Sequence, residues 1–327
     1  MRVLLPLLIA AVAACLPAAT TGDEPPASLP QRADAAVQGP QGEAAIHDLR
    51  RRLFERARSA PGEVSVALVD LESGAAIGIA DDVVMHAAST MKVPVLLELF
   101  RQAAEGRFAL ADSVRVRNEF TSIADGSRYA LSEEDDSEHE LYRLIGRRLS
   151  RMELARRMIA RSSNLATNLL IEEVDAASVR RTMRELGAAE TVVLRGVEDI
   201  PAYERGMNNT TTARALARVF AALARCERSE PIPALEPLTA SDCRRITAVL
   251  QEQEFRDRIP AGLPAGIRVA NKTGWISGIA HDAAIVYPPC RAPYVLVVLT
   301  RGISEDSTSI AVARDLSAIA WAGLTGR

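Results

Sequence analysis

Apolar positions in the amino-terminal part of the chain repeat first with a helical period and then with a strand-like one. Between residues 46 and 58 the apolar residues fall on one helical face, which predicts a helix. Runs rich in β-branched residues then predict strands at 64–69 and 76–79, with a turn at 72–74 between them. This part of the chain therefore predicts a helix followed by a β-hairpin.

The middle of the chain is mostly helical in period, and the end returns to strands. Predicted helices of the middle part cover 91–104, 151–172, 177–186 and 211–225. Predicted strands near the end cover 267–271, 281–287 and 293–300, and a final helix covers 308–322. Strand-forming segments thus lie at both ends of the chain, and helices lie between them.

Strands at both ends that enclose a helical middle predict an α+β fold with two lobes. One antiparallel sheet would be built from both chain ends and flanked by helices, in an α/β lobe of residues 44–108 and 262–327. Residues 109–261 would form an all-helical lobe. The cleft between the lobes is the expected place for a site.

The amino terminus predicts export. Its apolar run is too short to cross a bilayer and has the length of a signal-peptide core, so residues 1–14 are expected to be a signal peptide of the lipoprotein type. Cys15 would then be the lipidated first residue of the mature protein; ordinary cleavage near Ala18 or Ala19 is the alternative. Residues 15–43, rich in Pro, Ala, Gly and Thr, are expected to be a flexible linker. We expect a periplasmic protein, with a membrane anchor if Cys15 is lipidated.

Charge and composition argue against a nucleic-acid partner. The net charge is −3, and arginines alternate with acidic residues rather than forming a basic stripe. The strongest cluster is the acidic run at 133–140, which we interpret as a solvated loop, with a cation site as the alternative. The 48% hydrophobic content is enough for a large core, so a folded domain with a mixed surface is expected.

Three cysteines follow the predicted linker. In an oxidising compartment Cys226 and Cys243 could form a disulfide, worth about 3 kcal/mol if the geometry permits. The alternative is that these two and Cys290 are buried thiols. None of the three has metal-ligand spacing to a histidine.

Lysine is almost absent, and its two occurrences are informative. Of 39 basic residues only Lys92 and Lys272 are lysines, and all others are arginines. A general replacement of lysine by arginine on the surface explains the arginines but not these two positions. An arginine side chain keeps its proton in a protein, whereas a desolvated lysine can lose it. The two lysines are therefore candidates for tasks that arginine cannot perform.

Lys92 ends an S-x-x-K motif that begins at Ser89. Three residues apart on a helix, the two side chains would lie on one face, within contact distance. A neutral lysine amine could then take the serine proton. Its pKa would have to fall from about 10.4 toward 7, roughly 4 to 5 kcal/mol of differential interaction, which burial near a second cation such as Lys272 would provide.

Two further motifs carry polar chemistry. The S-S-N sequence of Ser162 and Asn164 interrupts a helical pattern and could face the cleft, although a serine here could simply cap the next helix. The K-T-G sequence at 272–274 continues a predicted strand, as an edge strand should if a substrate is to lie alongside it. Its lysine supplies a point charge, its threonine a hydroxyl, and its glycine room for close approach.

In this order the three motifs resemble those of the penicillin-recognising serine hydrolases, especially the class A β-lactamases, where S-x-x-K, S-D-N and K-T-G recur. The resemblance covers roughly 44–327. It implies that Ser89 is the acylated nucleophile, Lys92 its proton partner, and Ser162 the proton shuttle to the leaving nitrogen. The substrate-binding residues that it implies are Asn164, Lys272, Thr273, Gly274 and Trp275. The backbone N–H groups of Ser89 and Trp275 would form the oxyanion hole.

The resemblance also implies a deacylating carboxylate. Glu198 lies on a loop that begins near Arg195 and matches the glutamate with which β-lactamases activate water; a solvent-exposed loop carboxylate is the alternative. Three positions depart from the family pattern. Ala202 stands where an amide helps to hold the water, Asn209 stands where an acid would pair with Arg195, and Ser163 replaces the aspartate of S-D-N.

Rival catalytic schemes find little support. The sequence has no G-x-S-x-G elbow, and His281 and Asp282 are neighbours on a predicted strand, where side chains alternate faces. His86 is expected to be structural. No H-E-x-x-H motif or Cys/His cluster suggests a metal, and no cofactor is expected.

The sequence therefore predicts a serine β-lactamase that hydrolyses the β-lactam amide through a Ser89 acyl-enzyme. One alternative is a D-alanyl-D-alanine carboxypeptidase or slow penicillin-binding hydrolase, which shares the acylation half. Another is a lipoprotein that binds penicillin or peptidoglycan without turnover. In each case the partner is a small β-lactam or D-Ala-D-Ala peptide, and a monomer is expected.

Overall fold

The computed structural model describes residues 40–326. The predicted signal peptide (1–14) and Cys15 lie outside these residues, as does most of the predicted linker (15–43). The first helix, α2 (Pro40–Arg58), begins inside that predicted linker, several residues before the expected helix at 46–58.

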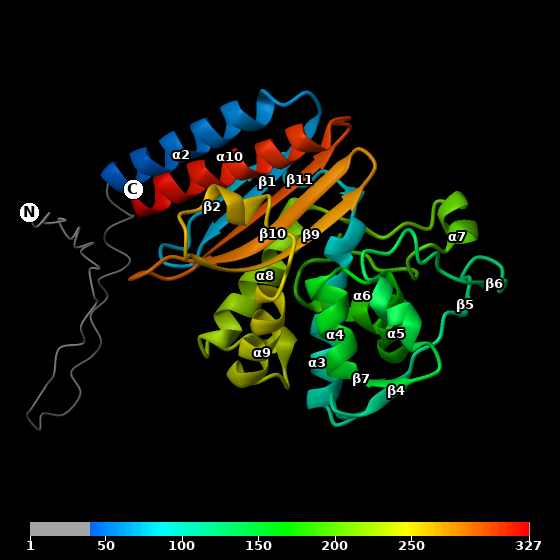
Figure 1. Cartoon of the computed structure of the whole chain (residues 1–327). Helices are drawn as coiled ribbons and strands as arrows, with labels where there is room; N and C mark the ends of the chain where they lie inside the picture. The colour runs from blue at the N-terminus through cyan, green and yellow to red at the C-terminus, as the bar shows by residue number, and fades with distance from the viewer. Residues whose placement is uncertain (1–39, 327) are drawn as a thin grey trace, which may run out of the picture.

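Strands from both ends of the chain form one antiparallel sheet of five strands, in the order β2-β1-β11-β10-β9 (Figure 1). Their bounds are β1 (Glu63–Asp70), β2 (Ala76–Ile79), β9 (Arg268–Ile276), β10 (Ile279–Tyr287) and β11 (Tyr294–Arg301). The first strand pairs with both the second and the last. This sheet, with helices on its faces and a helical region beside it, confirms the predicted α+β fold.

Both faces of the sheet are buried, each under its own apolar core. Successive side chains of a strand point to opposite sides, so neighbouring residues enter different cores. On β11, Val297 belongs to one apolar core and Val298 to the other. Helices α2 and α10 (Asp306–Thr325) cover the Val298 face, as Figure 1 shows above the sheet. On the other face α8 (Ala213–Glu227) packs against β1, β10 and β11. This core joins the sheet to the helical region.

The remaining helical segments lie mostly in the middle of the chain. They are η1 (Ala88–Met91), α3 (Lys92–Ala104), η2 (His139–Leu144), α4 (Arg151–Ala160), α5 (Asn164–Val174), α6 (Ala176–Glu185), α7 (Ile200–Glu204), η3 (Pro233–Leu235), α9 (Ala240–Gln251) and η4 (Ile259–Gly262). The helix predicted over 151–172 is two helices, α4 and α5. Ser162 separates them because its backbone adopts a positive φ of 58°, which no right-handed helix accommodates.

The second lobe is not all-helical as predicted. Within residues 40–326 it contains two-stranded ribbons, and a third joins it to the segment just before Ser89. They are β4 (Ser113–Arg115) with β7 (Arg148–Ser150), β5 (Phe120–Thr121) with β6 (Arg128–Tyr129), and β3 (Met85–His86) with β8 (Thr210–Thr211). Such short strands leave no period in the sequence, because alternation shows only over four or more residues.

A disulfide joins helices α8 and α9. Cys226 near the end of α8 and Cys243 on α9 are bonded, with Cα atoms 5.9 Å apart. Of the two possibilities raised by the sequence, the structure therefore has the disulfide for this pair.

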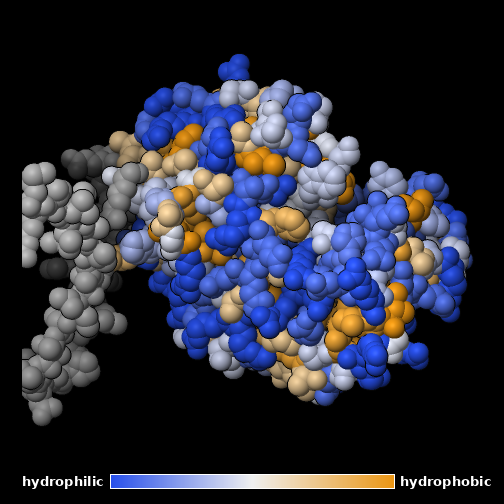
Figure 2. Space-filling view, in the orientation of Figure 1, coloured by the Kyte–Doolittle hydropathy of each residue, from blue (hydrophilic) through white to orange (hydrophobic). Residues whose placement is uncertain are grey.

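The surface is mixed in character. Figure 2 shows a mostly hydrophilic face on which apolar side chains gather in small groups. Between residues 40 and 326 no helix has both the length and the apolar character needed to cross a bilayer.

Candidate active site

Ser89 lies on a tight turn between β3 and α3. The turn is held by its neighbours: His86 Nδ1 accepts the N–H of Ala88 at 3.0 Å, and Thr90 Oγ1 donates to the carbonyl of Ala87 at 2.6 Å. Ala88 has a positive φ of 45°, a strained conformation that the surrounding contacts must maintain. The half-buried Ser89 hydroxyl itself makes no hydrogen bond to another described residue. The backbone of the turn thus positions the Ser89 oxygen, and no other residue of 40–326 uses it as a hydrogen-bond partner.

Lys92 is fully buried and reaches the junction between α4 and α5. Its Nζ donates to the carbonyl oxygen of Ser162, to Ser162 Oγ at 3.2 Å and to Asn164 Oδ1 at 2.9 Å. Burial lowers the pKa of Lys92 to about 7, although the carboxylates of Asp136 and Glu198 act in the opposite direction. The expected contact between Lys92 and Ser89 is not among the hydrogen bonds of Lys92 within residues 40–326, where its Nζ faces the three acceptors of this junction instead.

The two serines of the S-S-N motif have different tasks. Ser163 is the N-cap of α5, and its hydroxyl accepts the N–H of Ala166 at 3.1 Å. Ser162 instead turns its hydroxyl to the two lysines and accepts from Lys272 Nζ at 3.0 Å as well as from Lys92. The helix-capping alternative therefore describes Ser163, whereas Ser162 belongs to the site.

The K-T-G motif lies inside β9, the edge strand of the sheet nearest to Ser89. A Cβ atom on Gly274 would lie 3.1 Å from Ala88 Cβ and 3.2 Å from the Ser89 nitrogen, tighter than ordinary contact. Glycine is therefore what allows β9 to approach the turn that carries Ser89. Thr273 is largely buried beside it.

Lys272 is fully buried as well. Its Nζ donates to Ser162 Oγ and to the carbonyl of Thr273 at 2.9 Å. Burial lowers its pKa well below the ordinary value, and the charge of Lys92 lowers it further, whereas Asp282 raises it. Burial and the charge of Lys92 thus act against the charged state that the expected carboxylate binding by Lys272 requires.

Trp275 follows the glycine and pairs with Ala280 across the β9–β10 register. Its side chain is 55% exposed and donates through Nε1 to Asp306 at the start of α10, at 3.0 Å. The indole is thus anchored outside the core, while the backbone stays in the edge strand beside Gly274. The oxyanion role of its N–H remains a prediction.

Glu198 lies against the site rather than free in solvent. It is half-buried with a positive φ of 61°, and its carboxylate accepts the Ser132 N–H at 3.0 Å and the Asn164 Nδ2–H at 3.3 Å. Burial raises its pKa. Because Asn164 also contacts Lys92, its amide joins the two groups that would take protons.

The loop that carries Glu198 is closed by an amide in place of an ion pair. Asn209 Oδ1 accepts the N–H of Leu194 at 2.8 Å and that of Arg195 at 3.2 Å, and its Nδ2 donates to the carbonyl of Arg195 at 3.0 Å. The Arg195 guanidinium donates to the carbonyl of Met207 at 2.9 Å. Ala202, also on this loop, is fully buried.

Asn168 lies beside the site although no sequence motif indicated it. Its Oδ1 accepts the N–H of Val197 at 2.6 Å, and its Nδ2 donates to the carbonyl of Val197 at 3.0 Å, directly before Glu198. Asn168 follows Asn164 by four positions on α5, so both lie on one helical face. That spacing could have identified it from the sequence.

The interpretation of 133–140 as a solvated loop is wrong for two of its residues. Asp136 is 2% and Glu138 1% exposed. Glu138 accepts from Arg157 at 2.7 Å and Arg161 at 3.1 Å, and Asp136 accepts backbone N–H groups of α5. These carboxylates can be buried because charged or backbone donors satisfy them.

Arg258 is a second residue that the sequence did not reveal. It is 6% exposed, its charge acts on Lys272, and its Nε has no hydrogen-bond partner within the described chain. Arg258 thus places a buried positive charge beside the K-T-G strand. No motif surrounds it that would distinguish it from the other arginines.

His86 and His281 serve the fold. His281 is fully buried, with a pKa lowered to about 4 by burial, and its ring nitrogens contact the carbonyl of His86 at 2.9 Å and the N–H of Thr300 at 3.1 Å. These backbone contacts leave neither nitrogen for a nucleophile. Across residues 40–326 no group of His, Cys, Asp and Glu side chains is arranged to hold a metal ion.

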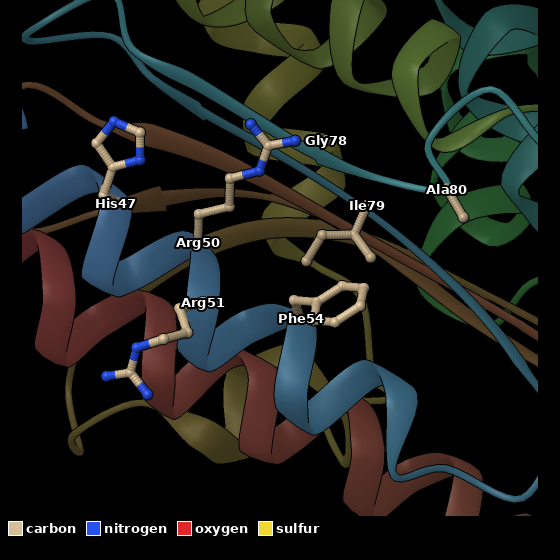
Figure 3. Close-up of a pocket in the computed structure, with 7 residues that line it drawn as sticks. All are labelled: His47, Arg50, Arg51, Phe54, Gly78, Ile79 and Ala80. Carbon is tan, nitrogen blue, oxygen red and sulfur yellow. The ribbon is translucent and has the colours of Figure 1, made fainter.

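A separate hollow lies far from this constellation. It has a volume of about 400 Å³ and lies between α2 and β2 (Figure 3). Its lining residues are His47, Arg50, Arg51, Phe54, Gly78, Ile79 and Ala80. β2 and β9 are opposite edges of the sheet, so this hollow is not part of the Ser89 site.

Comparison with known proteins agrees with the motifs and the fold. A model of the β-lactamase enzyme family matches residues 47–324. A β-lactamase of Streptomyces albus G is 28% identical over 306 residues, which are 92% of this chain and 90% of that protein. In fold, the structure of PBP-A matches with a TM-score of 0.71 at 23% identity, over 86% of this chain and 97% of its own. A β-lactamase from Sphaerobacter thermophilus DSM 20745 matches with a TM-score of 0.70 at 24% identity, over 84% and 96%. The chain therefore belongs to the β-lactamase enzyme family, as its resemblance to the class A enzymes predicts.

Proposed function

We propose that this protein is a serine β-lactamase that hydrolyses the β-lactam amide through an acyl-enzyme on Ser89. The observation that carries the proposal is one connected hydrogen-bond network. Ser162 Oγ accepts from both lysines, and Asn164 joins Lys92 to Glu198. Groups for both acylation and deacylation are thus linked beside the nucleophile turn.

Acylation begins with the neutral amine of Lys92 taking the Ser89 proton as Ser89 Oγ attacks the β-lactam carbonyl carbon. Backbone N–H groups of Ser89 and Trp275 stabilise the negative charge on the carbonyl oxygen. The C–N bond then breaks, and the leaving nitrogen receives a proton through Ser162. Both lone pairs of Ser162 Oγ face lysine donors, which leaves its own O–H free to donate to that nitrogen.

Substrate binding uses the edge strand. Lys272 and Thr273 bind the substrate carboxylate, and Arg258 adds a buried positive charge close by. The incoming carboxylate itself favours the protonated form of Lys272, because an opposite charge raises a lysine pKa. Substrate binding thus favours the positive charge that the burial of Lys272 disfavours.

Deacylation uses Glu198 as the base that takes a proton from water while the water oxygen attacks the carbonyl carbon of the Ser89 ester. The ester bond to Ser89 Oγ then breaks, the proton held by Glu198 returns to Ser89 Oγ, and the product acid is released. Its raised pKa makes it a better base than an exposed glutamate. Ala202 cannot hold the water, and the amide that contacts Glu198 here is that of Asn164.

A second candidate is a D-alanyl-D-alanine carboxypeptidase or slow penicillin-binding hydrolase. Ala202, in place of the amide that holds the water, favours it, and the fold likeness to PBP-A is compatible with it. Such a protein would share the acylation chemistry and deacylate slowly. A lipoprotein that is acylated but does not deacylate would have the slowest deacylation of the three candidates. Export to the periplasm is compatible with the β-lactamase, the carboxypeptidase and this lipoprotein alike.

Mass spectrometry after rapid mixing with penicillin separates these activities. A β-lactamase shows an adduct on Ser89 that decays while penicillin is consumed in bulk. A lasting adduct favours the stalled binder, and release of D-alanine from a D-Ala-D-Ala peptide favours the carboxypeptidase. Full penicillin hydrolysis by a Ser89→Ala variant would refute the whole proposal.

A further inference from the structure

Asp136 is a buried carboxylate with an unusual set of donors. Its Oδ2 accepts the backbone N–H of Asn164 at 2.8 Å and that of Leu165 at 2.9 Å, together with the hydroxyl of Tyr142 at 3.1 Å. The hydroxyl of Ser163 lies 3.5 Å from the same oxygen. Asp136 comes from the loop before η2, so this contact joins two segments that are distant in sequence.

The position of Asp136 follows from the needs of a helix amino terminus. The first N–H groups of a helix have no partner inside it, and the helix dipole favours a negative charge there. At α5, Ser163 satisfies the N–H of Ala166, and Asp136 satisfies the two N–H groups before it. The carboxylate therefore fixes the first turn of α5.

That first turn carries the central part of the site. Asn164, the first residue of α5, accepts from Lys92 and donates to Glu198, and Ser162 precedes it with a strained positive φ. A shift of this turn would move the amide that joins the two proton acceptors. Placement of Asn164 is thus set by Asp136 through the backbone.

The sequence explains why an outside carboxylate is needed. The family motif S-D-N has an aspartate at its middle position, where this chain has Ser163. The single hydroxyl oxygen of Ser163 already accepts the N–H of Ala166 and carries no charge, and the N–H groups of Asn164 and Leu165 are bound by Asp136 instead. The Asp136 carboxylate lies directly beside that shortened side chain.

We propose that Asp136 is a positioning residue, which supplies from a separate loop the carboxylate that the S-S-N motif lacks and thereby holds Asn164 between Lys92 and Glu198. The inference rests on the proposed function, since it assigns Asp136 to the acylation and deacylation of Ser89. Asp136 itself does not touch the reacting atoms.

The charge of Asp136 should affect the pH dependence of acylation, which a purely structural residue would leave unchanged. The charged and titratable groups around Lys92 are Asp136, Glu198 and Lys272, and those around the Asp136 carboxylate include Tyr142. The negative charge of Asp136 raises the pKa of Lys92. Its removal therefore lowers that pKa, and the acidic limb of the acylation rate moves to lower pH.

The test compares Asp136→Asn with the double variant D136N/S163D in single-turnover acylation by penicillin across pH. We expect D136N to acylate about 10- to 100-fold more slowly at its optimum, with its acidic limb at lower pH. The double variant restores a carboxylate at the middle of the motif and should recover most of the lost rate.

Glu138→Gln is the matched control, because Glu138 is a buried carboxylate of the same loop that binds Arg157 and Arg161. It should keep the wild-type pH midpoint even if it lowers stability.

Two results would overturn the proposal: wild-type acylation rate and pH midpoint in D136N, or no recovery of folding and acylation in the double variant. The second result decides the matter even if D136N alone does not fold. Failure of the proposed function looks different, because the wild-type protein would then form no adduct with penicillin at all.

Discussion

Lys92 and Lys272 donate to the same oxygen, Ser162 Oγ, at 3.2 and 3.0 Å. Both ammonium groups are fully buried, so desolvation lowers the pKa of each, and the charge of Lys92 lowers that of Lys272 further. Two lysines that share one hydroxyl in this way cannot both remain charged as readily as lysines in water. The arrangement provides one neutral amine for proton transfer and orients the Ser162 hydrogen toward a third partner.

The first prediction concerns the pH dependence of acylation. The amine of Lys92 acts as a base only when neutral, so the acylation rate should be low at pH 5 and rise with pH through a midpoint near 7, the pKa that burial gives Lys92. Single-turnover adduct formation with penicillin between pH 5 and 9 measures this. A rate independent of pH across this range would contradict the assignment.

The second prediction is that the protonation of Lys272 controls how KM for the substrate changes as the pH rises. Because its pKa is lowered, its ammonium is lost as pH rises, and KM for a carboxylate-bearing β-lactam should increase with pH in the wild-type protein. Lys272→Arg keeps a positive charge at every such pH. We expect KM of the folded K272R variant to be flat with pH, and the same rise in both proteins would rule out this role.

Glu198→Gln should separate the two half-reactions. An amide cannot take a proton from water, so deacylation should slow by about 100-fold or more, while acylation changes only a few-fold. Mass spectrometry should then show a long-lived adduct on Ser89. Glu204→Gln is the control, because Glu204 is an exposed carboxylate on the neighbouring α7 and should leave turnover unchanged. Unchanged deacylation in E198Q would remove Glu198 from the mechanism.

The Cys226–Cys243 disulfide should stabilise the fold without serving the chemistry. It closes a loop of sequence separation 17 between α8 and α9, for which the expected stabilisation is about 3 kcal/mol. Replacement of both cysteines by alanine should lower the free energy of unfolding by about that amount. The acylation rate of the folded variant should stay at the wild-type value, and a large rate loss would link these helices to the site.

The sheet was predictable because its strands are long and buried on both faces. The segment 293–300 is rich in β-branched residues and 281–287 ends in Ile-Val-Tyr. In the sheet, the later strand pairs both with the strand before it and with the first strand of the chain. The short ribbons were not predictable, since two or three residues carry no period. The break between α4 and α5 was visible as a polar interruption, but its cause, the positive φ of Ser162, was not.

The site residues also fall into those that the sequence could identify and those that only the three-dimensional structure reveals. Ser89, Lys92 and Lys272 could be identified because motif and composition drew attention to the same positions. Asp136 could not, since a carboxylate in an acidic run is usually solvated, and only three-dimensional contact shows that it binds the start of α5. The preference of Lys92 for Ser162 over Ser89 likewise depends on which acceptors the fold brings near.

Lys92→Arg tests the central claim most directly, since arginine replaces lysine at nearly every other basic position of this chain. An arginine side chain cannot release its proton to become a base. Single-turnover acylation of Ser89 by penicillin, followed by mass spectrometry in a variant whose folding is verified by its unfolding transition, should be at least about 100-fold slower than in the wild-type protein. Acylation at close to the wild-type rate would show that a neutral Lys92 is not the base that activates Ser89.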